Sequence, residues 1–153
     1  MVAIPGNAKG TGRAPARPAA KSTPARAVKP ARPAALPAAA AAVLTKATLR
    51  AAALLGLSNA ALARVVGVSE STVSRLASGQ RALEPGTKPA ELAALLVRLY
   101  RSLDAMVGNS DRQRQLWMAS YNRAFNAAPK DAIESADGLS RVLRYLDGAR
   151  AVV

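Results

Sequence analysis

The segment 59–78, NAALARVVGVSESTVSRLAS, constrains the fold more than any other part of the chain. Its apolar residues recur at spacings of three and four, which bring side chains to one face of a helix. Gly67 interrupts the pattern at its centre, and glycine reaches the positive φ that a sharp corner requires. Ser69 follows as an N-cap, because its hydroxyl can accept from a free backbone N–H of the next helix. The segment therefore predicts two short helices joined by a tight turn.

The two sides of this helix pair differ in composition. The apolar residues predicted to pack the helices together are Leu62, Ala63, Val66, Val68, Val73 and Leu76. The outward residues of the second helix and of the loop after it are short or polar: Glu70, Ser71, Thr72, Ser74, Arg75, Gln80 and Arg81. This is the pattern of a helix-turn-helix, whose second helix lies in the major groove of DNA. A hairpin in another all-α domain is the alternative, but it has no need of such a polar side.

The charge of the chain favours a polyanionic partner. Its 153 residues include 22 Lys and Arg against 9 Asp and Glu, a formal net charge of +13. Seven of the basic residues and none of the acids lie in residues 1–38. The other 15 basic residues face all nine acids, which leaves +6 for the rest of the chain. We therefore expect DNA or an acidic protein surface as the partner.

The chain contains no cysteine and no histidine. Disulfides, thiolate chemistry, zinc sites and histidine bases are therefore excluded. The acidic residues show no close pairing beyond scattered helix positions, and no glycine-rich phosphate loop appears. We expect no enzyme activity, no metal site and no cofactor.

Residues 1–38 consist largely of Ala, Pro, Lys and Arg and form the first of three predicted regions. Frequent prolines oppose a helix and there is little large apolar surface to bury, so we expect a disordered tail. Its basic residues would add non-specific affinity for DNA through counterion release, or the tail has no specific role. The sequence that follows the first residue lacks the apolar stretch of a secretory signal.

Residues 39–108 form the second region, a predicted helix-turn-helix bundle. The stretch 39–56 predicts a helix whose apolar stripe is Val43, Leu44, Ala47, Ala51, Leu54 and Leu55. Lys46 and Arg50 interrupt the stripe, so we expect no membrane span. A long helix is predicted over 89–107, with proline in its first turn and a glycine after its end.

Residues 109–153 form the third region and carry the only tryptophan of the chain, Trp117. Ser110 and Gln113 fit a capping box that opens a helix. Helices are predicted over 111–121, 129–135 and 139–146, with turns at 126–129 and 137–138, and Gly148 ending the last helix. Because every predicted element is a helix, we expect an all-α protein.

The third region resembles the C-terminal part of the Xre/MbcA/ParS antitoxins. The residues that carry the resemblance are, in order, Trp117, Asn122, Phe125, Pro129, Ile133, Gly138, Val142 and Leu146. In that family a tryptophan helix precedes an asparagine, a large apolar residue, a short helix started by proline, a glycine turn and a last helix. An Xre-like helix-turn-helix precedes this part in the family, as here, so the resemblance covers about residues 44–153. One difference is Tyr121, which stands where the family commonly has a proline before the asparagine.

The resemblance implies an antitoxin of a type II toxin–antitoxin system. Such antitoxins silence a partner toxin, commonly a RES-domain enzyme that destroys NAD⁺, by blocking its active site. They also bind the DNA of their own operon as homodimers, within a larger toxin–antitoxin complex in the bacterial cytoplasm. The resemblance places toxin binding in residues 109–153 and the blocking end at residues 147–153.

Amphipathic side chains of this region are the candidates for toxin binding, because protein interfaces favour them. They are Tyr121, Arg123, Arg141, Arg144, Tyr145 and, near the end of the chain, Arg150 and Val153. Trp117 and Phe125 are instead expected in the core, since small helical domains need aromatic volume. Two alternatives stay open: a stand-alone dimeric helix-turn-helix regulator without a toxin, and a protein that packs DNA through its basic tail.

Overall fold

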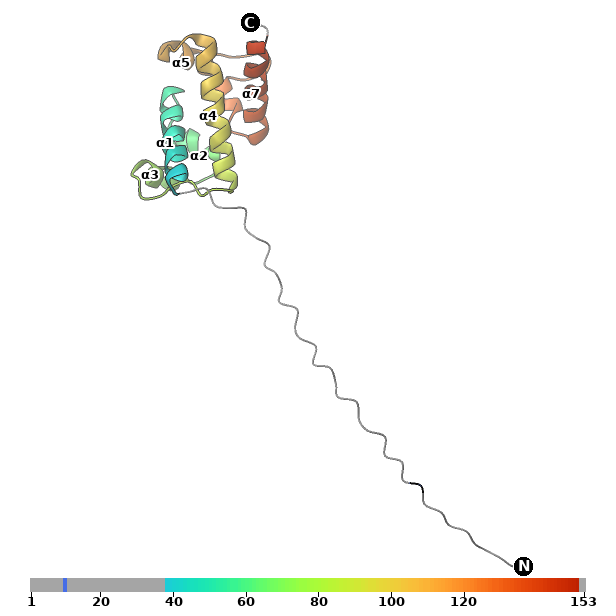
Figure 1. The fold of residues 1–153 in the computed structure, drawn as a ribbon. Coiled ribbons are helices and arrows are strands. Elements are labelled where there is room, and N and C mark those ends of the chain that lie inside the picture. The colour runs from blue at the N-terminus through green and yellow to red at the C-terminus, as the bar shows by residue number, and fades with distance from the viewer. Residues whose placement is uncertain (1–9, 11–37, 152–153) are drawn as a thin grey trace, which may run out of the picture. The chain divides into compact units, whose positions relative to one another are not determined.

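A computed structural model describes residue 10 and residues 38–151 of the protein. Within these residues the fold contains helices and no strand, which confirms the predicted all-α class (Figure 1). The helices are α1 (Ala38–Leu54), α2 (Asn59–Val66), α3 (Glu70–Ala77), α4 (Lys88–Val107), α5 (Asp111–Ala119), α6 (Pro129–Ala132) and α7 (Ala136–Ala151). None of these helices combines the length and the apolarity that a membrane span requires. The predicted tail, residues 1–38, lies outside the described residues except for Gly10 and Ala38.

The longest helix, α4, is shared by two groups of helices. The Thr87 hydroxyl caps its first turn by accepting from the Ala90 N–H, and Gly108 follows its end with a φ of 74°. Buried leucines recur along it at spacings of three and four: Leu92, Leu96, Leu99 and Leu103. α4 packs against α1 and α2, and also against α5 and α7 (Figure 1). The long helix predicted over 89–107 is therefore confirmed, and it supports both halves of the fold.

The predicted helix-turn-helix is confirmed as α2 and α3. Ser58 and Ser69 cap the two helices, each accepting from a backbone N–H three residues later, at 3.1 Å and 3.2 Å. Gly67 ends α2 with a φ of 71°, the left-handed conformation that glycine adopts without a Cβ clash. The buried residues that hold the pair together are Leu62, Ala63, Val65, Val66, Val73 and Leu76.

The buried face of α1 differs from the predicted apolar stripe. Val43 is 68% exposed, although the stripe placed it in the core. The residues that α1 buries are Ala41, Thr45, Thr48, Ala51 and Ala52. Thr45 and Thr48 can be buried because their hydroxyls donate to the carbonyls of Ala41 and Leu44, at 2.8 Å and 2.7 Å. A prediction that counts only apolar side chains therefore rotates the helix away from its true buried face.

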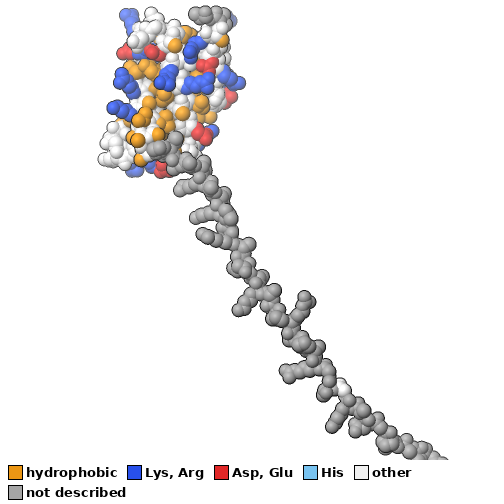
Figure 2. Space-filling view, in the orientation of Figure 1, with side chains coloured by type: hydrophobic (Ala, Val, Ile, Leu, Met, Phe, Trp, Pro, Cys, Tyr) orange, Lys and Arg blue, Asp and Glu red, His pale blue; other side chains and the backbone are white. Residues whose placement is uncertain are grey.

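Val43 instead borders an apolar groove on the surface between α1 and α4. The groove has a volume of about 510 Å³ and is lined mainly by Val43, Leu44, Ala47, Val97 and Tyr100. Arg50 and Arg101 also line it. Figure 2 shows apolar side chains gathered on the face that carries α1 and α4, with Lys and Arg around them. Part of the predicted stripe is therefore a surface feature.

In the third region, α5 begins where the capping box predicts it. The Ser110 hydroxyl accepts from the Gln113 N–H at 3.3 Å. The helix ends at Ala119, two residues before its predicted end. α6 begins at Pro129, in the first turn where the missing proline N–H costs no hydrogen bond. It is a single turn that ends at Ala132, so it is shorter than predicted.

The last helix is longer than predicted at both ends. The sequence predicts a turn at Asp137-Gly138 and a helix end at Gly148, and both predictions are wrong, because α7 includes all three residues. Gly138 serves close packing: a Cβ there would lie 1.8 Å from the Ala132 carbonyl oxygen. The contact between α6 and the first turn of α7 therefore requires glycine, whereas the backbone conformation does not.

Candidate nucleic-acid and protein interfaces

The outward side of α3 forms a polar ridge, which we call the α3 ridge. Its exposed residues are Glu70, Ser71, Ser74 and Arg75. Thr72, also predicted to point outward, is half-buried, and its hydroxyl lies 2.9 Å from the hydroxyl of the cap residue Ser69. Arg75 forms no ion pair within residues 38–151. The ridge is thus accessible to an outside partner along the length of the helix.

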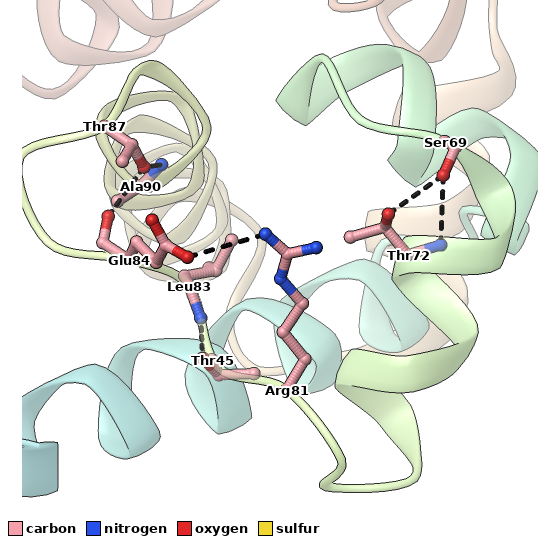
Figure 3. A network of polar contacts seen from close by, with 8 residues as sticks. All are labelled: Thr45, Ser69, Thr72, Arg81, Leu83, Glu84, Thr87 and Ala90. Carbon is pink, nitrogen blue, oxygen red and sulfur yellow. Dashed lines mark hydrogen bonds and ion pairs between the residues drawn. The ribbon is translucent and has the colours of Figure 1, made fainter.

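The loop after α3 holds Gln80 and Arg81 next to the end of that helix. The backbone N–H groups of both residues donate to the Arg75 carbonyl, at 3.0 Å and 3.2 Å. Arg81 Nη2 lies 3.6 Å from Glu84 Oε1, and both side chains are largely exposed, so the ion pair is weak. Figure 3 shows the Arg81 guanidinium between Glu84 and Thr72. Both predicted loop residues are therefore exposed beside the α3 ridge.

A buried hydrogen bond fixes this loop to α1. The Leu83 N–H donates to Thr45 Oγ1 at 2.9 Å (Figure 3). Further along, the Thr87 hydroxyl donates to the Glu84 carbonyl at 2.6 Å. Thr45 is 6% exposed and lies 38 positions before Leu83, so local sequence patterns give no signal of the contact. The loop that carries Gln80 and Arg81 is therefore positioned by a residue outside the helix-turn-helix.

Residues 121–127 form a tight loop between α5 and α6. The backbones of Asn122 and Ala127 pair across it, with the Asn122 N–H donating at 3.0 Å. The Tyr121 hydroxyl donates to Asn126 Oδ1 at 2.6 Å, and Asn126 adopts a φ of 54°, which asparagine tolerates. Tyr121 is 64% exposed. Hydrogen bonds of Asn122 and Asn126 therefore hold the loop in one conformation, with the Tyr121 ring exposed on it.

Three aromatic rings from different segments meet near this loop. The Phe125 ring centroid lies 5.2 Å from that of Tyr145 and 6.4 Å from that of Trp117, both edge to face. Phe125 is buried and Trp117 packs half-buried against the core, as the sequence predicts. Tyr145 is 43% exposed, so it shares in the aromatic cluster and still reaches the surface.

The arginines predicted to bind a toxin lie at the surface. The exposed ones are Arg123, Arg141, Arg144 and Arg150. Arg141 lies 3.6 Å from Asp137, one turn earlier on α7. Arg150 Nη1 donates to the Ser102 hydroxyl at 3.5 Å. Val153, the last of the predicted residues, lies outside the described residues.

The last turns of α7 are held against α4. The Asp147 carboxylate accepts from Arg98 Nη2 at 2.5 Å and from the Ser102 hydroxyl at 3.0 Å. The sequence predicts a short tail over residues 149–153, and this is wrong for residues 149–151, which belong to α7. The helix continues through Gly148, and the residues on either side of it, Asp147 and Arg150, contact α4.

Two family models match the chain, one after the other. The antitoxin Xre-like helix-turn-helix domain matches residues 34–98, and the antitoxin Xre/MbcA/ParS C-terminal toxin-binding domain matches residues 102–151. The chain belongs to the Xre/MbcA/ParS antitoxin family. No curated protein was found to match it. The antitoxin therefore has a toxin as its partner, and its toxin-binding domain spans the end of α4 through α7.

The sequence did not reveal that this antitoxin buries an arginine, Arg114. The residue is 1% exposed, and its guanidinium donates to the carboxylates of Asp104 and Asp111. The guanidinium carbon also lies 5.4 Å from the centroid of the Tyr100 ring. The spacing of Asp111 and Arg114 on one helix could have signalled a pair. The partners on α4 become visible only in the fold, where they join α5 to α4.

A polar contact also joins α2 of the helix-turn-helix to the toxin-binding domain. Arg64 Nη2 on α2 lies 2.8 Å from Oε1 of Glu134, which follows α6. This hydrogen bond raises the pKa of the Arg64 guanidinium and lowers the pKa of the Glu134 carboxyl, against a smaller opposing effect of desolvation. Both side chains keep part of their contact with water, so the pair links the halves without burying charge.

Proposed function

We propose that this antitoxin represses its own operon by binding DNA and neutralises its toxin by blocking the toxin's active site. The observation that carries the DNA-binding part is the α3 ridge, which is exposed on a short helix whose N-terminus is capped by Ser69. The toxin-binding part rests on the family match over residues 102–151. We expect the antitoxin to act in the bacterial cytoplasm.

The α3 helix would lie in the major groove of the operator. Its Glu70 carboxylate can accept from cytosine N4, and the Arg75 guanidinium can donate to guanine O6 and N7. Short hydroxyl side chains allow the helix to approach the base edges closely: Ser71, Thr72 and Ser74. Gln80 and Arg81 would contact the phosphate backbone from the loop after α3.

One recognition helix reads only a few base pairs. We therefore expect a two-fold homodimer on a pseudo-palindromic operator, held within a larger complex with the toxin. In this arrangement residues 39–108 bind DNA and residues 109–153 bind the toxin. Residues 1–38 carry seven basic residues that would add salt-dependent affinity for DNA.

The toxin that we propose is a RES-domain enzyme that degrades NAD⁺, as the resemblance implies. The exposed Tyr121 and Tyr145 rings offer amphipathic area to a protein partner, and Arg123, Arg141 and Arg144 offer charge. Arg150, in the last turn of α7, and Val153, at the end of the chain, would lie at the mouth of the toxin's active site. Such a block prevents substrate entry by volume alone, so the antitoxin needs no catalytic group and no cofactor.

Coexpression with the neighbouring gene product tests the toxin part. We expect that gene alone to arrest growth and lower cellular NAD⁺, and coexpression to restore growth and give a complex that purifies intact. Recovery of the antitoxin without a partner, together with unrelieved arrest, would contradict neutralisation. Relief of an arrest that leaves NAD⁺ unchanged would keep the antitoxin role and remove the RES assignment.

Titration of the DNA upstream of the operon tests the repressor part. We expect Arg75→Ala to weaken binding to the specific site by about 1–3 kcal/mol. Specific binding without any toxicity when the gene is deleted would indicate a stand-alone dimeric regulator. Binding that is indifferent to sequence and abolished by moderate salt would indicate DNA packing.

A further inference from the structure

The α3 ridge alone carries little positive charge for a surface that faces DNA. Arg75 is its one basic residue, and the carboxylate of Glu70 on the same short helix offsets that charge. Phosphates of the duplex flank the groove that a recognition helix enters, and they need cations beside that helix. The residues around α3 are therefore the place to look for backbone contacts.

A hollow of about 370 Å³ adjoins the C-terminal end of α3. Residues from α1, α3 and the following loop line it, among them Lys46, Leu49, Leu76, Ala77, Gln80 and Arg81. None of the lining residues is acidic. Ala77 lies three positions after Ser74 on α3, so the hollow continues the exposed ridge along the same helix face. Its rim is therefore cationic and lies beside the groove-facing residues.

The two cations of the rim are available to a ligand. Lys46 is exposed and forms no ion pair within residues 38–151. Arg81 has only the weak contact with Glu84, at 3.6 Å between largely exposed side chains. A phosphate at the hollow would compete well with that contact, because a guanidinium binds phosphate oxygens through two parallel hydrogen bonds.

The two walls of the hollow are held at a fixed separation. Lys46 follows Thr45, whose buried hydroxyl accepts from the Leu83 N–H at 2.9 Å. Arg81 lies on the other wall, and its backbone N–H donates to the Arg75 carbonyl at 3.2 Å. A clamp of this kind loses little conformational entropy when it binds, because its backbone is already in place.

We propose that Lys46 on α1 and Arg81 on the loop together bind one backbone phosphate of the DNA that α3 reads. This inference rests on the proposed DNA-binding function and adds to it a contact from outside the helix-turn-helix. A phosphate contact carries no sequence information, so it should strengthen binding to every duplex by a similar factor.

The test is a set of DNA titrations at several salt concentrations with the full-length chain. We expect the double variant Lys46→Met/Arg81→Met to reduce the slope of log K against log salt by about 0.9 in magnitude, the value of one phosphate contact, because either cation alone would still bind the phosphate. At 0.1 M salt this corresponds to a loss of about eightfold on operator and on unrelated duplex alike. Lys130→Met is the matched control, because Lys130 is an exposed lysine on α6 without an ion pair among the described residues. It should bind like the wild type.

The outcomes separate this proposal from the function beneath it. If the wild-type protein binds the operator and the double variant keeps the wild-type slope, the proposed phosphate contact is wrong and the repressor function stands. If the wild-type protein binds no DNA, both proposals fail.

The NMR signal of the Lys46 ε-methylene distinguishes a backbone phosphate of DNA from a free phosphate ion as the ligand of this site. A shift with duplex but not with inorganic phosphate at equal ionic strength supports the backbone contact. Saturation by phosphate alone overturns it.

Discussion

The two halves of the antitoxin differ in both their surfaces and their interiors. The α3 ridge is made of short polar side chains, and the helices beneath it are packed by Leu, Val and Ala. The toxin-binding domain exposes two tyrosines and encloses an aromatic cluster and a buried arginine. Short polar side chains let a helix approach base edges, whereas tyrosine and arginine contribute contact area to protein interfaces. The difference in chemistry therefore matches the difference in partner that we propose.

The halves also differ in what holds them together. Hydroxyl caps occur in both halves, at Ser58 and Ser69 and at Ser110, but the helix-turn-helix is otherwise packed by aliphatic contacts that tolerate small changes. The toxin-binding domain depends on single contacts without a substitute, at Gly138 and Arg114. We therefore expect the most damaging single substitutions to fall in the toxin-binding domain.

The largest effect should come from Gly138→Ala. A Cβ at this position meets the Ala132 carbonyl oxygen at 1.8 Å, and backbone cannot give way as a flexible side chain does. We expect the free energy of unfolding to fall by at least about 3 kcal/mol. Urea unfolding followed by circular dichroism measures it.

Gly148→Ala is the control for that substitution, on the same helix. A Cβ at Gly148 has no atom within 4 Å, so alanine should raise the free energy of unfolding by about 0.5–1 kcal/mol. Equal effects of the two substitutions would mean that the close approach of α6 and α7 is wrong.

Arg114→Met should have the next largest effect. The variant keeps apolar volume but leaves Asp104, whose side chain is 30% exposed, without its guanidinium partner. We expect a loss of about 2–3 kcal/mol in the free energy of unfolding. Arg98→Met removes an arginine from a pair in which it is 62% exposed, and should change stability by less than about 1 kcal/mol. A smaller loss in the free energy of unfolding for Arg114→Met than for Arg98→Met would contradict a stabilising role of the buried arginine.

The smallest effect concerns the Arg64–Glu134 pair that links the halves. Because Arg64 lowers the pKa of the Glu134 carboxyl below its ordinary 4.5, the pair contributes stability above that pH. The contribution is lost as the pH falls through the lowered pKa. Wild type should therefore exceed Glu134→Gln in stability at pH 6, and the difference should shrink as the pH falls below 4.5. A difference that does not change with pH would show that the pair does not form in solution.

The parts of the structure that neighbours in the chain decide could be predicted from the sequence. Gly67 and Ser69 specify a corner and a cap within three residues, and the helix-turn-helix follows from them. The face of α1 was misplaced because Thr45 and Thr48 satisfy their hydroxyls within the helix and so count as core. Gly138 was misread as a turn, because a sequence does not separate a glycine needed for conformation from one needed for space.

The candidate interfaces also contain residues that local sequence predicts and residues that only the fold brings together. The α3 ridge could be predicted because its residues alternate with a buried face on one short helix. Lys46 could not, since it joins Arg81 only through a fold that brings α1 beside the loop after α3. The burial of Arg114 could not be predicted either, because the partner that neutralises its charge, Asp104, lies on another helix.

The most direct test of the two-surface account is a pair of exposed variants, Arg75→Ala and Tyr121→Ala, each titrated with operator DNA and with the toxin. We expect the affinity of Arg75→Ala for the operator to fall at least about fivefold, and its affinity for the toxin to stay unchanged. We expect the reverse for Tyr121→Ala, whose affinity should fall by about fivefold or more for the toxin alone. Operator affinity unchanged in Arg75→Ala, or a loss of both partners in either correctly folded variant, would contradict the two-surface account.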